Sequence, residues 1–149
     1  MRCLTKDIRE SSRRSRRPWR PGWARSRLSR CKRDWETFLK AIALASDLRK
    51  ETPRDEYLLA DVGGYYAAIG MKEESLPLLA QAAALAPAVP QVLYQVAIGY
   101  EDLHHRDEAL RWLARAKASG YPSESIVRNP QLAALRADPR YGATVGGAR

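Results

Sequence analysis

The chain has 149 residues, enough for one domain with a modest core and a tail. Its formal net charge of +9 suggests a nucleic-acid partner until the charges are located along the sequence. Residues 1–33 hold eleven arginines and two lysines against two acidic residues, a net charge of +11, whereas residues 34–149 carry 13 basic and 15 acidic groups, a net charge of −2. This distribution excludes a strong general field around the folded part.

The cysteines and the apolar runs indicate neither metal binding nor secretion. Cys3 and Cys31 are 28 positions apart, without a CxxC pair or a nearby histidine, so we expect neither a zinc site nor a disulfide framework. The basic N-terminus lacks the apolar run of a secretory signal, and no stretch is long and apolar enough to cross a membrane. We therefore expect a cytoplasmic protein without membrane association.

Residues 1–33 are predicted to form a basic disordered tail, because many like charges and two prolines accompany very few aliphatic residues. Three interpretations stay open: a solvated extension, which includes an upstream region mis-assigned as coding; a nucleic-acid-binding arm; and a membrane-surface anchor. The lack of an apolar helical face argues against the anchor. In the arm, arginines would neutralise phosphates and tryptophans would stack on unpaired bases. The candidate nucleic-acid contacts are Arg13, Arg14, Arg16, Arg17, Trp19 and Trp23.

From Asp34 to Lys50 the sequence predicts an amphipathic helix, since apolar residues return at three- and four-residue steps. Those residues are Trp35, Phe38, Leu39, Ile42, Ala45 and Leu48. Asp34 is the expected N-cap of this helix. Pro53 lies one repeat period before Pro87, so we interpret the helix as the second half of a truncated repeat with an exposed end.

Residues 56–122 repeat themselves at an interval of 34 residues, which is typical of a stacked repeat array. Small residues recur at this interval as well as large apolar ones. The matching pairs are Leu59 and Leu93, Val62 and Val96, Gly63 and Ala97, Tyr66 and Tyr100, Ser75 and Ala109, Leu76 and Leu110, Leu79 and Leu113, and Ala82 and Ala116. A register this consistent predicts two similar helical hairpins.

Caps and breakers set the expected bounds of the four helices in these hairpins. Thr52 is the expected cap of the first helix, and Gly70 and Gly120 are expected to end the first and the fourth. Residues 104–106 form the expected tight turn of the second hairpin. The helices are expected to run from Thr52-Pro53 to about Ile69, from Glu73-Glu74 to near Ala86, from Pro90 to near Leu103, and from Asp107-Glu108 to Gly120.

After Gly120 the sequence predicts a short helical turn over 123–126 and a short helix over 131–137, which Asn129-Pro130 starts and Asp138-Pro139 ends. We expect this segment, from about residue 121, to cap the repeat domain. Ile126, Leu132 and Leu135 would then lie over the open face of the last hairpin. Residues 142–149 are expected to be frayed.

The repeat period, the paired helices, Tyr66 and Tyr100, the Asp-Glu-Ala-Leu run at 107–110, and Pro53 and Pro87 together resemble the tetratricopeptide repeat (TPR) family. The resemblance covers residues 35–122, about two and a half repeats. It implies an all-α fold: a right-handed α-solenoid of antiparallel helix pairs, with a repeat domain and cap over residues 34–141. The small residues at matching positions would let the two helices of each pair cross closely.

The segment after Gly120 resembles, more loosely, the segment that closes the repeat region in multidomain bacterial regulators. In those proteins the repeats follow a protein kinase, a cyclase-like domain or a winged-helix domain. This resemblance implies that the chain is the C-terminal part, or a remnant, of a larger bacterial regulatory protein.

No residue pattern in the chain predicts catalysis or a bound cofactor. Gly63-Gly64 and Gly146-Gly147 lack the spacing and the following Lys-Ser/Thr of a phosphate loop. His104 and His105 are adjacent in a turn without an accompanying cysteine, so a surface turn is favoured over a metal site. The paired acidic residues stand where helices begin, a position that the helix dipole explains. We therefore expect a protein that is not an enzyme and that uses no metal or cofactor.

In TPR proteins the first helix of each pair lines a concave groove, and the resemblance implies a partner-binding groove here. Its residues would be Tyr57, Ala60, Gly64, Ala67, Gln91, Tyr94, Ile98 and Glu101. The Lys, Asn and Arg side chains with which some relatives clamp a peptide carboxylate are absent from these positions. We expect an extended or helical peptide, or a partner protein, to bind there. Two alternatives stay open: packing of these residues against a missing repeat, and a nucleic-acid-binding adaptor that acts through the N-terminal arginines.

Overall fold

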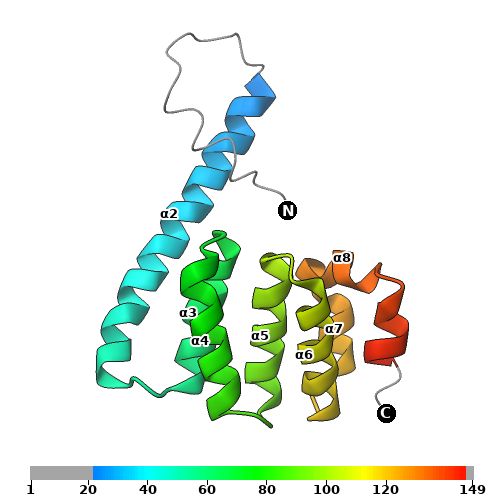
Figure 1. Cartoon of the computed structure of the whole chain (residues 1–149). Coiled ribbons are helices and arrows are strands. Elements are labelled where there is room, and N and C mark those ends of the chain that lie inside the picture. The colour runs from blue at the N-terminus through cyan, green and yellow to red at the C-terminus, as the bar shows by residue number, and fades with distance from the viewer. Residues whose placement is uncertain (1–21, 147–149) are drawn as a thin grey trace.

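The computed structural model describes the backbone of residues 22–146 and the side chains of residues 35–146, and this part of the chain is all-helical (Figure 1). It contains packed helix pairs and no strand between residues 22 and 146, which confirms the predicted all-α class. The elements are α2 (Gly22–Glu51), α3 (Glu56–Ala68), α4 (Lys72–Leu85), α5 (Pro90–Asp102), α6 (Arg106–Ala118), α7 (Ser123–Arg128), the 3₁₀ turn η1 (Pro130–Leu132), α8 (Ala133–Arg136) and the π-helical turn η2 (Gly142–Gly146).

Helix α2 is 30 residues long and begins at Gly22, well before the predicted start at Asp34. Asp34 is therefore not an N-cap, and residues 22–33, predicted as part of a disordered tail, are helical. The reason is local, because residues 23–51 contain no glycine or proline that would stop a helix, and arginine is a good helix former. The rest of the predicted tail, residues 1–21, lies outside the described part of the chain. Figure 1 shows α2 rising past the ends of the other helices.

The connection from α2 to α3 corrects the predicted role of Thr52. Its hydroxyl donates a hydrogen bond to the Leu48 carbonyl (3.2 Å), so Thr52 belongs to the C-terminal end of α2. The N-cap of α3 is Asp55, whose carboxylate accepts from the Leu58 N–H (2.9 Å). An aspartate at this position satisfies one of the free N–H groups of the first turn. Its negative charge also interacts favourably with the positive end of the helix dipole.

Three helices end in the same way, with a left-handed residue two positions after the last helical residue. These residues are Gly70 (φ 76°), His104 (φ 62°) and Gly120 (φ 99°). After α3, the Gly70 N–H donates to the Ala67 carbonyl and the Met71 N–H to the Tyr66 carbonyl, and the ends of α5 and α6 repeat this pattern. The arrangement satisfies carbonyls that a helix end leaves free. The predicted helix ends at Gly70 and Gly120 are confirmed.

Small residues bring the helices of the first pair close together, as their spacing predicts. The Ser75 hydroxyl donates to the Gly63 carbonyl (2.7 Å), a side chain to backbone bond between α4 and α3. Leu79, fully buried, fits against two glycines: a Cβ atom at Gly63 would lie 2.8 Å from its side chain, and one at Gly99 would lie 2.7 Å from it. Since Gly63 belongs to α3 and Gly99 to α5, Leu79 joins the first pair to the second.

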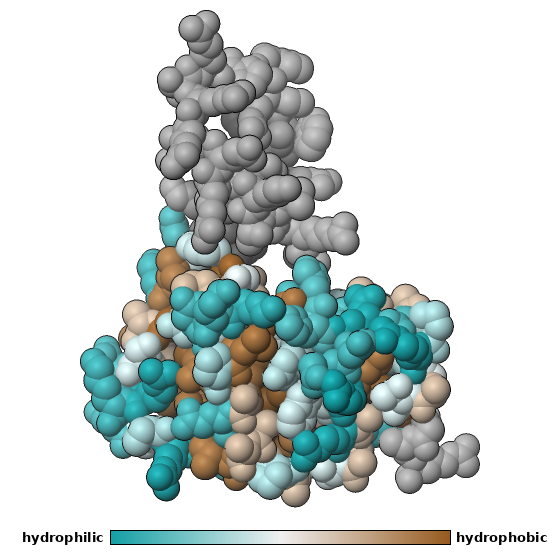
Figure 2. Space-filling model, viewed as in Figure 1, coloured by the Kyte–Doolittle hydropathy of each residue, from teal (hydrophilic) through white to brown (hydrophobic). Residues whose placement is uncertain are grey.

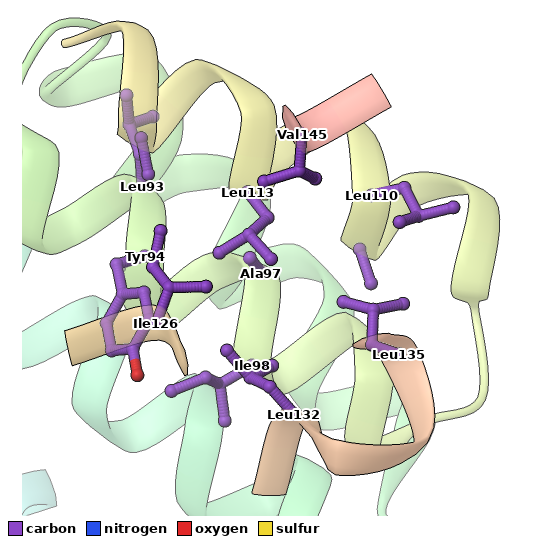
Figure 3. Close-up of a cluster of buried hydrophobic side chains, with 12 residues drawn as sticks. Leu93, Tyr94, Ala97, Ile98, Leu110, Leu113, Ile126, Leu132, Leu135 and Val145 are labelled. Carbon is purple, nitrogen blue, oxygen red and sulfur yellow. The ribbon is translucent and has the colours of Figure 1, made fainter. Parts of the chain in front are cut away.

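The C-terminal segment, residues 121–146, packs against α5 and α6. Its side chains Ile126, Leu132 and Leu135 are buried there as predicted (Figure 3). The expectation of a frayed end is wrong for residues 142–146. They form η2, in which Val145 is buried in the same cluster and its carbonyl accepts from Lys117 Nζ (2.9 Å). Burial of an apolar side chain plus one charge-assisted hydrogen bond orders this turn. Residues 147–149 lie outside the described part of the chain.

Candidate partner-binding surface

The C-terminal segment covers two α5 residues of the predicted groove, Tyr94 and Ile98. Tyr94, Ile98 and Glu101 are each less than a tenth exposed. Figure 3 shows Tyr94 and Ile98 among side chains of the C-terminal segment, with Ile126 beside Tyr94 and Leu132 beside Ile98. These three residues therefore do not line an open groove, which corrects the sequence-based expectation.

Tyr94 is held by two contacts that come from beyond Gly120. Its ring stacks on that of Tyr121, with centroids 4.0 Å apart and planes 14° from parallel. Its hydroxyl accepts a hydrogen bond from Asn129 Nδ2 (2.6 Å). Burial, and then the neighbouring Tyr94, raise the pKa of Tyr121 above its usual value. Tyr94 is thus an anchor for the C-terminal segment, and its position on the first helix of a pair does not make it a ligand contact.

Glu101 is a buried carboxylate with an internal partner. Its Oε1 accepts from Arg106 at 2.8 Å, a salt bridge that links the end of α5 to the start of α6. Its Oε2 is buried without a hydrogen-bond partner. Glu101 thus has its charge partner within the protein, on the far side of the turn, and does not need a ligand to balance it.

Ala60 and Ala67 also leave the predicted groove, because both are almost fully buried. They lie on the side of α3 that faces the rest of the protein, and Ala60 shares a buried cluster with Val92 and Val96 of α5. An alanine at position 60 allows α3 and α5 to approach closely. Their small size therefore serves helix packing, not ligand access.

Three predicted groove residues remain accessible, and all lie on one face of α3 and α5. Tyr57 is 48% exposed, and Gln91, one repeat period later, is exposed at the matching position of α5. Gly64, two turns after Tyr57 on the same side of α3, has nothing within 4 Å of where a Cβ atom would stand. The accessible site is therefore smaller than the predicted one and centred on α3.

Three polar residues outside the predicted groove, Asp61, Gln95 and Asp102, join this face. Gln95 Nε2 donates to Asp61 Oδ1 (3.0 Å), a bond between the two helices. The two residues are separated by one repeat period. The sequence signal for their contact is therefore a polar side chain at the same repeat position in both copies. Asp102 follows on the same side of α5, and burial, together with the adjacent Glu101, raises its pKa to about 6. We call Tyr57, Asp61, Gly64, Gln91, Gln95 and Asp102 the α3–α5 face.

The predicted nucleic-acid contacts cannot be placed on this face. Arg13, Arg14, Arg16, Arg17 and Trp19 lie outside the described residues, and Trp23 lies within α2 at a position whose side chain is not described. Their role therefore stays a prediction. Between residues 35 and 146, no three His, Cys, Asp or Glu side chains gather in a way that could hold a metal ion. In the same part of the chain, no helix is both long and apolar enough to pass through a lipid bilayer.

Comparison of the chain with known protein families, with curated proteins and with solved structures finds no match. The likeness to tetratricopeptide repeats therefore depends on the residues of this chain alone.

Proposed function

We propose that the chain is a non-enzymatic protein-interaction scaffold of the TPR type, a right-handed α-solenoid that binds a peptide or partner protein on the α3–α5 face. Supporting this are the 34-residue period, two packed helix pairs, and small residues at the crossing of each pair. The proposal keeps the class of function that the sequence predicts and moves the site from the whole concave side to α3 and the adjoining positions of α5.

The observation that carries the proposal is Gly64, which lies two turns from the exposed Tyr57 on the same side of α3. A glycine inside a helix costs roughly 0.5–1 kcal/mol relative to alanine. Close packing of Leu79 leaves no space for a side chain at Gly63 and Gly99, which explains those two glycines. At Gly64, by contrast, a side chain would meet open space. A bare stretch of backbone two turns from an exposed tyrosine suits close approach by a ligand that packs on the ring and extends over the glycine.

The chemistry of the face favours a ligand that donates hydrogen bonds. Asp61 and Asp102 contribute carboxylates, and Gln91 and Gln95 contribute amides, whereas the face contains no lysine or arginine. A segment with an apolar or aromatic side chain for Tyr57, and with N–H or amine donors on either side, meets these groups. Because the face is shallow and mixed in polarity, we expect a short peptide segment and not a small metabolite.

Selection of peptides from a random display library against the full-length chain tests this proposal. The enriched peptides are then titrated by calorimetry against the wild type, Tyr57→Ala and Gly64→Leu. We expect both variants to bind at least about tenfold more weakly, since loss of a central tyrosine contact costs about 1–2 kcal/mol or more. Val127→Ala, at an exposed position of α7, is the matched control and should bind as the wild type does.

Two outcomes contradict the proposal: a library that yields no binder, and binders that do not distinguish these variants from the wild type. Salt dependence adds a second criterion. Binding on the α3–α5 face should change little between low and moderate ionic strength, whereas binding through the arginines of residues 1–33 should fall steeply. A steep dependence with an equal response of all variants would point to the nucleic-acid alternative.

A further inference from the structure

An apolar stripe on α2 has no partner in the described part of the chain. Leu44 is 69% exposed and Leu48, one turn later, is 55% exposed. Ile42 and Ala45, at other positions around the same helix, are buried where α2 packs on α3. In Figure 2, brown surface gathers over the end of the molecule that α2, α3 and α4 form, whereas teal and pale surface covers most of the opposite end. Isolated exposed leucines are common, but two on adjacent turns of one helix face form a patch.

The repeat register shows what such a stripe does elsewhere in this chain. Residues 38–51 of α2 correspond to residues 72–85 of α4, one period later. Leu44 corresponds to Leu78 and Leu48 to Ala82, and both of these are buried in the cluster that α4 shares with α3. By analogy with α4, a second helix should cover this face of α2. No helix between residues 35 and 146 does so.

The sequence around the stripe is complementary to itself when two helices run antiparallel. Lys40 and Glu51 are exposed at opposite ends of the stripe and on the same flank of α2. In an antiparallel pair centred between Leu44 and Leu48, the leucines of one copy meet those of the other, and Lys40 of each faces Glu51 of its partner. A twofold axis then relates the leucines of one copy to those of the other, and one ion pair to the second.

A parallel pair would be unfavourable for an independent reason. Residues 22–33, in the N-terminal part of α2, contain five basic residues and no acidic residue. A parallel arrangement would bring these two basic segments side by side, whereas an antiparallel arrangement sends them to opposite ends. Like charges on adjacent helices disfavour a pairing, so charge selects the antiparallel orientation.

We propose that two copies of the chain associate through α2, antiparallel and about a twofold axis, with Leu44 and Leu48 at the centre and two Lys40–Glu51 ion pairs at the sides. The α3–α5 face involves other residues, so this interface is separate from the proposed ligand site. A dimer of this kind presents two such faces.

Sedimentation equilibrium of the full-length chain tests the proposal. The wild type should be a dimer at micromolar concentration. Leu44→Glu/Leu48→Glu should raise the dimer dissociation constant by at least about 100-fold, because it places four carboxylates in the apolar contact. Val127→Glu, which changes an exposed apolar residue on α7, should leave the dissociation constant unchanged. Circular dichroism should show wild-type helicity for both variants, since the substituted positions are exposed.

A charge swap tests the orientation. Lys40→Glu alone and Glu51→Lys alone each turn two attractions into two repulsions and should weaken the dimer on the order of tenfold at low salt. The double variant Lys40→Glu/Glu51→Lys restores opposite charges and should recover wild-type affinity. A wild type that stays monomeric at about 100 µM overturns the proposal. In that case the stripe binds residues 1–21 or another protein. A leucine variant that still dimerises, or a double variant as weak as the single ones, also overturns it.

Discussion

Two neighbouring glycines of α3 have opposite roles. At Gly63 a Cβ atom would stand 2.8 Å from the Leu79 side chain and 3.2 Å from its backbone nitrogen. Leu79 has little room to move away, because its other methyl group packs against Gly99, where an added Cβ atom would stand 2.7 Å from it. At Gly64, by contrast, a Cβ atom meets nothing within 4 Å. The first glycine is required by packing, and the second is free to be exchanged without steric cost.

Alanine at each position separates these roles. Gly63→Ala should lower the free energy of unfolding by about 1–3 kcal/mol, since the overpacked Leu79 has no space to shift. Gly64→Ala should raise it by about 0.5–1 kcal/mol, since alanine is the better helix former. Urea denaturation followed by circular dichroism measures both. Equal effects of the two substitutions would show that the close contact of Leu79 with Gly63 does not hold the first helix pair.

At the scale of elements, the C-terminal segment covers part of the predicted groove and leaves another part open. Tyr94 and Tyr57 represent these two parts, because Tyr94 lies on α5 beneath the segment and Tyr57 is half exposed on α3. Tyr94 loses its stacking on Tyr121 and its hydrogen bond from Asn129 if the segment detaches. The segment is therefore attached by specific contacts as well as by apolar burial.

Alanine substitution of the two tyrosines distinguishes anchoring from exposure. Tyr94→Ala should lower the free energy of unfolding by about 3 kcal/mol, because a buried aromatic ring and its partners are lost. Tyr57→Ala should change it by less than about 0.5 kcal/mol, as expected for a surface position. Thermal unfolding, with Tyr94→Phe as the variant that removes only the hydroxyl, measures the difference. If Tyr94→Ala were as mild as Tyr57→Ala, the C-terminal segment would not cover α5 in solution.

These elements also show which features the sequence could predict. The helix ends at Gly70 and Gly120 were predictable, because a left-handed glycine after a helix is a local requirement. The face of α5 that the C-terminal segment covers was not, since it depends on Tyr94 meeting Tyr121, and neighbours in sequence say nothing about that contact. Tyr57 and Gly64 of the predicted groove are open because no later segment in the described part of the chain covers their side of α3.

At the scale of the whole molecule, the helix pairs are joined to one another by a few buried side chains and closed at one end. Leu79 contacts glycines in both pairs, whereas Leu132 of η1 lies in the cluster that joins the C-terminal segment to α5 and α6. In stacked arrays each unit contacts only its neighbours, so the position of a defect should decide how far its effect spreads. Both leucines are fully buried, which makes them a matched pair.

Hydrogen exchange of Leu79→Ala and Leu132→Ala measures that spread. Each substitution should cost about 2–5 kcal/mol at its own site. Leu79→Ala should increase exchange throughout α3 to α6, because the contact between the two pairs is weakened. Leu132→Ala should increase exchange in α7, α8, η2 and the adjoining α5 and α6, and leave α3 and α4 close to the wild type. Identical exchange patterns would mean that the molecule opens as one cooperative unit, in which the helix pairs and the C-terminal segment do not unfold separately.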